Sequence, residues 1–129
     1  MSFLARLELD GEEMSILHCG FRFSQSIDTT GKPVSRPRGG TINLTVESTG
    51  DTQLFDWMIN PTQTKNGKVT FYRRDTSSKL KVLEFADAYC VDYNETYSHT
   101  GDHPMQIELV ISAFELKLND SEYKNNWPV

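Results

Sequence analysis

Apolar and polar residues alternate with a period of two along most of this chain, and that alternation constrains its fold more than any other feature. In TINLTVE, residues 41–47, the apolar residues Ile42, Leu44 and Val46 alternate with polar ones. Successive side chains of a β-strand point to opposite faces, so the pattern predicts a strand with one face buried. Comparable runs cover residues 3–10, 16–27, 67–74, 79–97 and 105–118. The chain of 129 residues is therefore predicted to form one mainly β domain, 1–129.

Two dipeptides mark predicted turns between these runs. Asp10-Gly11 separates the first two runs and favours a tight hairpin between them. Asn66-Gly67 precedes the run at 67–74 and predicts a second tight turn.

The last run changes the face on which its apolar residues lie. Apolar residues occupy odd positions from Ile107 to Ala113 and even positions from Phe114 to Leu118. A strand changes face in this way only where it bulges or bends. The run at 79–97 is apolar on both faces in places. Long strands that bend and are covered on both sides favour a small closed β-barrel of two sheets.

The segment DTQLFDWMI, residues 51–59, breaks the alternation and predicts one short helix. Leu54, Trp57 and Met58 recur at helical spacing and form one apolar stripe. Asp51 suits the start of the helix, and Pro61 disfavours its continuation. A helix this short is not stable alone, so the stripe is predicted to pack on the barrel core or to contact a neighbouring subunit.

Charge and hydropathy exclude several classes of protein. The formal net charge of −5 argues against a general nucleic-acid-binding protein, and no run of apolar residues is long enough to insert in a membrane. The N-terminus has no basic segment followed by an apolar run, so it does not resemble a standard secretory signal. We expect synthesis and assembly in the cytoplasm and, if the protein is exported, export without a signal peptide.

The candidates for site chemistry are few. His99, Asp102 and His103 in SHTGDHP (98–104) are a candidate metal or ligand site, although Gly101 and Pro104 indicate a solvated loop. The chain has no nucleophile, zinc or phosphate-binding motif. It is therefore predicted to be a structural protein without catalytic residues, cofactor or metal.

Three further residues have open interpretations. Cys19 and Cys90 are expected to be buried thiols, but a disulfide bond stays open because sequence does not give their separation. Trp127 belongs either to a frayed end or to an anchor on a partner.

The stretch TTGKPVSRPRGGT, residues 29–41, departs from the acidic character of the chain. It carries Lys32, Arg36 and Arg38 and no acidic residue. Such a segment is typical of a mobile loop, of an arm that enters a nucleic-acid groove, or of an arm that docks on an acidic protein. In an acidic chain the favoured partner is a second copy, and such a head-to-tail contact builds rings or stacks.

Several segments together resemble the Hcp (TssD) family, the tube proteins of bacterial type VI secretion systems. These are the opening strand MSFLARLELDGEE, the segment CGFRFSQSIDTTGKPVSRPRGGTINLTVES, the helix DTQLFDWMI, and the strands KVLEFADAYCVDYNETY and MQIELVISAFELKL. The resemblance covers essentially the whole chain and indicates a short, divergent branch of the family.

The resemblance implies a β-barrel that assembles into a homohexameric ring, and rings that stack into a tube. It implies partners as well: a contractile sheath, a spike protein at the tube tip and effector proteins in the channel, with no cofactor. It places the family's extended loop at 28–40 and a subunit boundary near the helix at 51–59. The tail-tube protein of a phage or of an extracellular contractile injection particle is the alternative. A small β-barrel enzyme or ligand binder that uses residues 98–104 is a third.

Site residues follow from the resemblance and the charges. Ring contacts are expected from the extended loop, at Lys32, Pro33, Arg36, Pro37, Arg38, Gly39 and Gly40. Its cations are expected to meet acidic residues of a neighbouring copy, with candidates Glu12, Glu13, Asp120 and Glu122. Channel-facing candidates are Asn43, Thr45 and Glu47.

Overall fold

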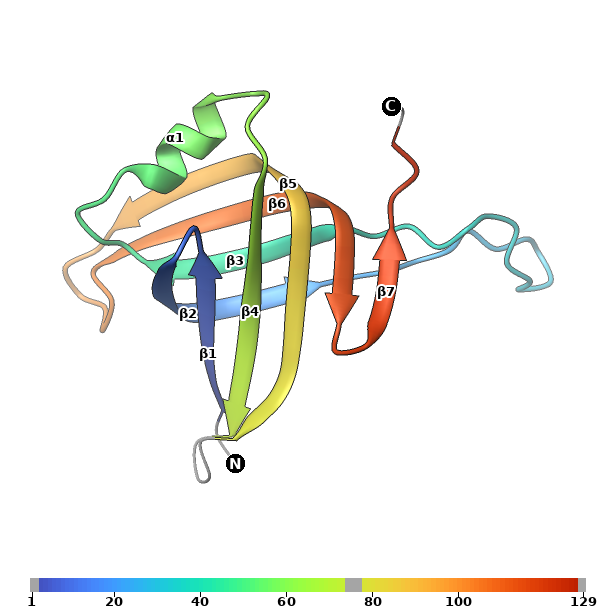
Figure 1. Ribbon diagram of the computed structural model, residues 1–129, viewed down its shortest axis with the longest axis horizontal. Coiled ribbons are helices and arrows are strands. Elements are labelled where there is room, and N and C mark those ends of the chain that lie inside the picture. The colour runs from blue at the N-terminus through green and yellow to red at the C-terminus, as the bar shows by residue number, and fades with distance from the viewer. Residues whose placement is uncertain (1–2, 74–77, 128–129) are drawn as a thin grey trace.

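The computed structural model describes residues 3–73 and 78–127, and these form seven strands and one short helix (Figure 1). Arg74, the last residue of the predicted run 67–74, lies outside the described residues. The elements follow in this order: β1 (Phe3–Leu9), β2 (Glu12–Phe21), β3 (Thr41–Glu47), α1 (Gln53–Ile59), β4 (Lys65–Arg73), β5 (Lys79–Tyr97), β6 (Met105–Leu118) and β7 (Ser121–Lys124).

The strands close into a barrel, as the sequence predicts. The strand order is β3-β2-β1-β4-β5-β6-β7, and an additional pairing of β3 with β6 closes the ring of strands and leaves β7 outside it. All neighbouring strands are antiparallel. The pairing runs continuously around the barrel, because β5 and β6, with 19 and 14 residues, bend and take part in both of its halves.

The predicted hairpin and the predicted core are both confirmed. Leu9 pairs with Glu12 across a two-residue turn in which Asp10 and Gly11 both have positive φ, 51° and 81°. Inside the barrel, Ile42, Leu44 and Val46 of β3 are buried, as their alternation predicts. They pack with apolar residues of β1, β4, β5 and β6 in one core cluster.

The face change predicted in the last strand is confirmed, and β5 shares it. In β6 the buried side chains lie at odd positions up to Ala113 and then at the even position Leu116. In β5 they lie at odd positions up to Phe85 and then at the even position Ala88. Between the two positions on β5 lies Asp87, whose φ of 52° is left-handed. The Asp87 amide donates to Asn66 Oδ1 at 2.8 Å, so the neighbouring strand β4 stabilises the bend.

Asn66-Gly67 does not form the predicted turn. Both residues lie inside β4, where the register with β5 shifts between Lys65 and Gly67. A Cβ atom at Gly67 would lie 2.6 Å from Phe85 Cζ and 2.7 Å from Glu8 O. Gly67 therefore allows the strands to approach closely at a bulge. An Asn-Gly pair at a bulge has the same sequence signature as one in a turn, so the sequence alone does not distinguish the two.

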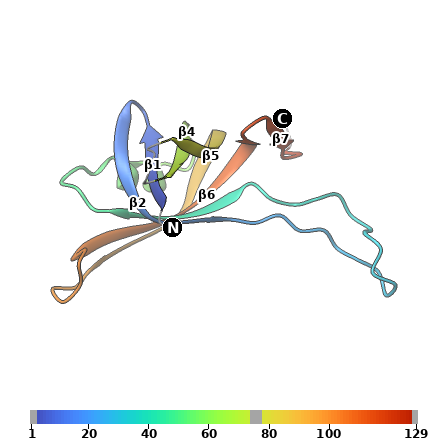
Figure 2. The ribbon, with the colours of Figure 1, turned by 90° about the horizontal axis from the view of Figure 1, so that it is seen from below.

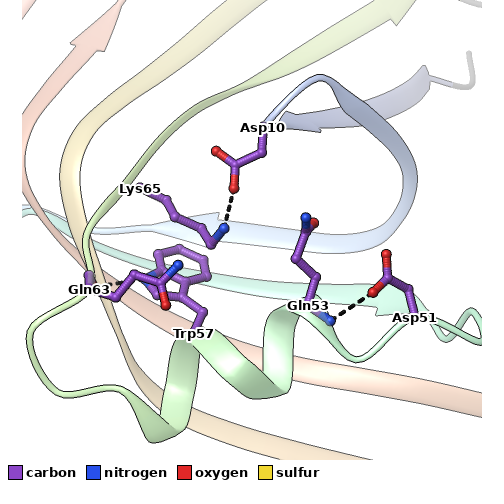
Figure 3. A network of polar contacts seen from close by, with 6 residues as sticks. All are labelled: Asp10, Asp51, Gln53, Trp57, Gln63 and Lys65. Carbon is purple, nitrogen blue, oxygen red and sulfur yellow. Dashed lines mark hydrogen bonds and ion pairs between the residues drawn. The ribbon is translucent and has the colours of Figure 1, made fainter.

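The helix α1 begins two residues later than predicted, at Gln53. Asp51 nevertheless accepts a hydrogen bond from Gln53 N at 2.9 Å, so it serves the first turn as expected (Figure 3). Trp57 is buried, and its Nε1 donates to Gln63 O at 3.2 Å.

Lys65 is the unexpected charge in this region. It is 7% exposed, forms an ion pair with Asp10 in the β1–β2 turn and lies 6.0 Å from the Trp57 ring centroid (Figure 3). The pair joins the β1–β2 turn to the helix, because Trp57 packs beside the lysine.

Candidate assembly surfaces

The segment between β2 and β3, residues 22–40, leaves the barrel as a long ribbon that we call the arm (Figures 1 and 2). Its two halves pair with each other. Ser24 and Arg38 exchange backbone hydrogen bonds at 3.0 and 2.7 Å, and Val34 N donates to Ser26 O at 2.9 Å. The arm therefore starts before residue 28, the first residue of the predicted loop, because the outgoing half pairs with the returning half.

Asp28 organises the tip of the arm. Its Oδ1 accepts hydrogen bonds from Thr30 N, Thr30 Oγ1 and Lys32 N at 2.9, 2.7 and 3.1 Å. The side-chain bond from Thr30, followed by the backbone bonds from Lys32 and Thr30, lowers the pKa of Asp28 below its ordinary value. The tip is therefore a hydrogen-bonded turn, with Gly31 at a positive φ of 88°.

The three cations of the arm are not equivalent. Within the described part of the chain, Lys32 and Arg38 are exposed and form no ion pair with a carboxylate. The Arg36 guanidinium donates to Lys124 O, in β7 of the same chain, at 3.2 Å. Lys32 and Arg38 are thus more available to a neighbouring molecule than Arg36.

The arm also exposes two apolar side chains that were not predicted from the sequence to be contacts. Ile27 and Val34 are each 63% exposed. The signal was weak: Ile27 continued a strand-like alternation, and Val34 was a single apolar residue in a polar stretch. A partner that covers the arm would bury both side chains.

Two of the predicted acidic residues lie in one charged row that crosses the outside of the barrel. Strand register aligns Glu13 and Glu8 with Lys68 of β4, and the row continues across β5, β6 and β7. Its members, in order, are Glu13, Glu8, Lys68, Glu84, Lys117 and Glu122. Glu13 also pairs with Arg6 at 3.6 Å. The remaining acidic candidates, Glu12 and Asp120, are exposed beside opposite ends of this row.

The predicted channel residues share one polar face. Register aligns His18, Thr45, Glu108 and Asn94 across β2, β3, β6 and β5. Asn43 and Thr45 line a shallow hollow on this face, together with His18, Asp92, Asn94 and Glu108. Asn43 and Glu47 are exposed and Thr45 is half-buried.

Both edges of this four-stranded face lack a strand partner among the described residues. β1 pairs with β2 only from Glu12 to Ser15, so the side of β2 that faces away from β3 is open from Ile16 to Phe21. β4 pairs with β5 only as far as Ala88, so β5 is open beyond that residue on the side away from β6. Each edge presents the backbone groups that a further strand would pair with.

The apolar stripe of α1 packs on the barrel. Leu54 and Trp57 are buried in the core, and Met58 packs against it. The helix face left for a neighbouring copy is the opposite one, where Phe55 and Ile59 are 43% and 61% exposed. Phe55 also contacts the Tyr93 ring edge-on, with centroids 5.5 Å apart.

The remaining candidates are local contacts. His103 Nδ1 lies 3.8 Å from Glu47 Oε2, and the described residues contain no group of three or more potential metal ligands. Trp127 is half-buried and packs on the Tyr89 and Phe114 rings at 5.7 and 5.5 Å, so it is held against the barrel and is not a frayed end.

Cys19 and Cys90 are both free, so the disulfide alternative is wrong. Burial raises the pKa of each thiol to about 11.

Among the described residues, no helix combines the length and the apolar character that a membrane-spanning helix needs.

Comparisons with known proteins agree with this geometry. The model of the family described as hemolysin coregulated protein Hcp (TssD) matches residues 1–128. The structure of Hcp1 from Flavobacterium johnsoniae is similar at 37% identity and a TM-score of 0.91, over 95% of this chain and 99% of that one. A search of curated proteins found no match.

More distant structures share the fold. Hcp1 from Salmonella typhimurium matches at 13% identity and a TM-score of 0.76, over 95% of this chain and 92% of that one. The sheath-tube complex of an extracellular contractile injection system in its extended state contains a chain at 15% identity and a TM-score of 0.57. That match covers 89% of this chain and 87% of the other.

Proposed function

This chain belongs to the hemolysin coregulated protein (Hcp, TssD) family, and from that membership we propose that it is a structural subunit of the inner tube of a type VI secretion apparatus. The observation that carries the proposal is the four-stranded face with two open edges, at β2 and at β5. Pairing of the β2 edge of one copy with the β5 edge of the next is a head-to-tail contact. Such a contact closes a ring when its rotation allows closure.

The same face supplies the wall of a channel. Edge-to-edge pairing joins the outer faces of β2, β3, β6 and β5 from successive copies into one continuous surface. Most residues on that surface are polar, Asn43, Thr45 and Glu47 among them, and the half-buried Val110 lies between them. A polar wall suits a channel through which folded effector proteins travel, because it offers them no extended apolar surface on which to adhere.

The arm suits a contact between rings. It projects from one end of the barrel, whereas α1 and the loop at 98–104 lie at the other end (Figures 1 and 2). Lys32 and Arg38 at one end and the acidic residues Glu12 and Glu13 on the barrel give the subunit complementary ends. In the assembled apparatus, the stacked rings lie inside a contractile sheath with a spike protein at the tip, and the tube leaves the cell with its effectors.

The experiment that tests this function is the mass of the purified chain in solution, followed by electron microscopy of the same fraction. Six copies of the 14.7 kDa chain give about 88 kDa. We expect particles of that mass with a central hole, alone or in stacks. A monomer that persists at high concentration would contradict the proposal.

A tail-tube role in an extracellular contractile injection particle is the second candidate, and the likeness to the sheath-tube chain is what favours it. The two roles differ in how the tube leaves the cell. Release into the medium should stop when a membrane-complex gene of the secretion system is deleted. Continued release inside free particles would favour the second role.

A further inference from the structure

The last described segment of the chain, residues 121–127, lies against the base of the arm. β7 is outside the closed barrel and, among the described strands, pairs only with the end of β6, from Glu115 to Leu118. After β7, Asn125 N donates to Phe114 O at 2.7 Å, and Trp127 packs on Tyr89 and Phe114. The segment is therefore fixed to the barrel on one side, independently of the arm.

Its other side holds the arm through side chains of β7 and Asn125. The Tyr123 hydroxyl donates to Pro37 O at 3.2 Å and lies 3.1 Å from Asn125 Oδ1. Asn125 Nδ2 donates to Gly39 O at 3.2 Å and to Ala113 O at 2.8 Å. One amide group thus joins the returning half of the arm to the barrel strand β6.

Two further contacts engage both halves of the arm. Arg36, on the returning half, donates to Lys124 O. Phe23, on the outgoing half, packs edge-on against the Tyr123 ring with centroids 4.8 Å apart. The arm is consequently held on both of its chains at the point where it leaves the barrel.

The two glycines at the base of the arm allow this contact to close. A Cβ atom at Gly39 would lie 2.1 Å from the Phe23 ring. Gly40 has a positive φ of 98°, and a Cβ atom there would lie 2.3 Å from Asn125 Nδ2. A side chain at Gly39 would displace Phe23 from its contact with Tyr123, and a side chain at Gly40 would push Asn125 away from the arm.

We propose that residues 121–127 form a clamp that sets the direction of the arm, with Tyr123 and Asn125 as its positioning residues. A ribbon of two strands is only marginally stable by itself, so the arm needs an external support to keep one direction. A fixed direction lets the arm dock without first losing conformational freedom, which raises affinity. The role in docking rests on the proposed function, whereas the clamp itself is a property of the single chain.

The test is hydrogen–deuterium exchange of three variants, read by peptide. Tyr123→Phe removes the hydroxyl and keeps the ring on Phe23, and Asn125→Ala removes both amide donors. Tyr72→Phe, on β4, is the matched control. We expect exchange in residues 24–38 to rise about fivefold in each clamp variant, as the loss of a hydrogen bond of ~1 kcal/mol predicts. Exchange in β1, β3 and β4 should not change, and the control should match the parent chain.

Two outcomes would overturn the proposal. One is unchanged exchange in the arm for both clamp variants. The other is an equal rise in the arm and the barrel, because that would show a general loss of stability. Measurement on unstacked material keeps this result separate from the proposed function. If the parent chain forms no rings, the tube function fails while the exchange result still decides the clamp.

Stacking provides the second readout. We expect Tyr123→Phe to form rings of unchanged mass that stack less than rings of the parent chain. Rings that stack as well as those of the parent, despite a loosened arm, would overturn the link between the clamp and docking.

Discussion

At the scale of single residues, the close approaches inside the barrel decide what each position tolerates. Gly67 lies where β1, β4 and β5 come together, and the space for a side chain is filled by Phe85 and the Glu8 carbonyl. Lys65 is buried a short distance away and depends on Asp10 for a counter-charge. The Asp10 carboxylate is itself exposed, so the cost arises on removing Asp10, which would leave the buried Lys65 charge without its partner.

Gly67→Ala should destabilise the fold by about 1–3 kcal/mol, since the new methyl group overlaps Phe85 and the β1 backbone. Urea unfolding at one fixed protein concentration measures the change. Gly50→Ala is the control, because no atom lies within 4 Å of the added Cβ. The prediction fails if both variants unfold at the same midpoint.

At the scale of elements, the arm combines a rigid base with a charged, partly apolar outer part. Arg36 belongs to the base, where it contacts Lys124 O. Lys32 and Arg38 remain exposed, as do Ile27 and Val34. Exposed ion pairs contribute only about 0–1 kcal/mol each, so the charges should adjust docking that the apolar contacts also support.

The double variant Lys32→Glu with Arg38→Glu should reduce stacking of rings at low salt while leaving the rings intact. At about 1 M salt the Debye length falls to about 3 Å, so the difference from the parent chain should shrink. Light scattering across a salt series measures it. A matched charge reversal on β5, Lys79→Glu with Lys81→Glu, should stack like the parent. Equal stacking of both double variants at low salt would refute the electrostatic contribution.

At the scale of the whole molecule, the barrel is closed, but one of its faces has strand edges without hydrogen-bond partners among the described residues. The face formed by β2, β3, β6 and β5 ends in two open strand edges. Unpaired edges of this kind favour association with another chain. In the proposed tube, these edges would direct assembly around the ring and the arm would direct it along the tube.

Edge-to-edge pairing can be tested with engineered cysteines. His18→Cys on β2 is combined in turn with Asp92→Cys, Asn94→Cys or Thr96→Cys on β5, because alternate residues share a face. We expect mild oxidation of one pair to give a ladder up to the hexamer on a non-reducing gel. Each single variant should stay uncrosslinked, and dimers from a single variant would indicate a two-fold contact instead of a head-to-tail ring.

Much of this protein follows from the sequence by itself. The period of two fixes which residues of β3 face the core, because the alternation of side chains is a local property of a strand. The face change after Ala113 follows for the same reason, and the hairpin at Asp10-Gly11 follows from the local preference of these two residues for positive φ. The basic arm stood out in the sequence as a positively charged stretch in an acidic chain, and the family resemblance predicted a role for it in contacts between subunits.

Only the tertiary structure decided how distant segments meet. Sequence spacing does not show that Gly67 serves a bulge, that α1 turns its apolar stripe inward, or that Trp127 packs on the barrel. The clamp of Tyr123 and Asn125 on Pro37 and Gly39 joins residues 86 positions apart. The clamp depends on the pairing of β3 with β6, because that pairing places the base of the arm beside the segment that follows β6. A pairing between strands so far apart in the sequence leaves no local pattern in the chain.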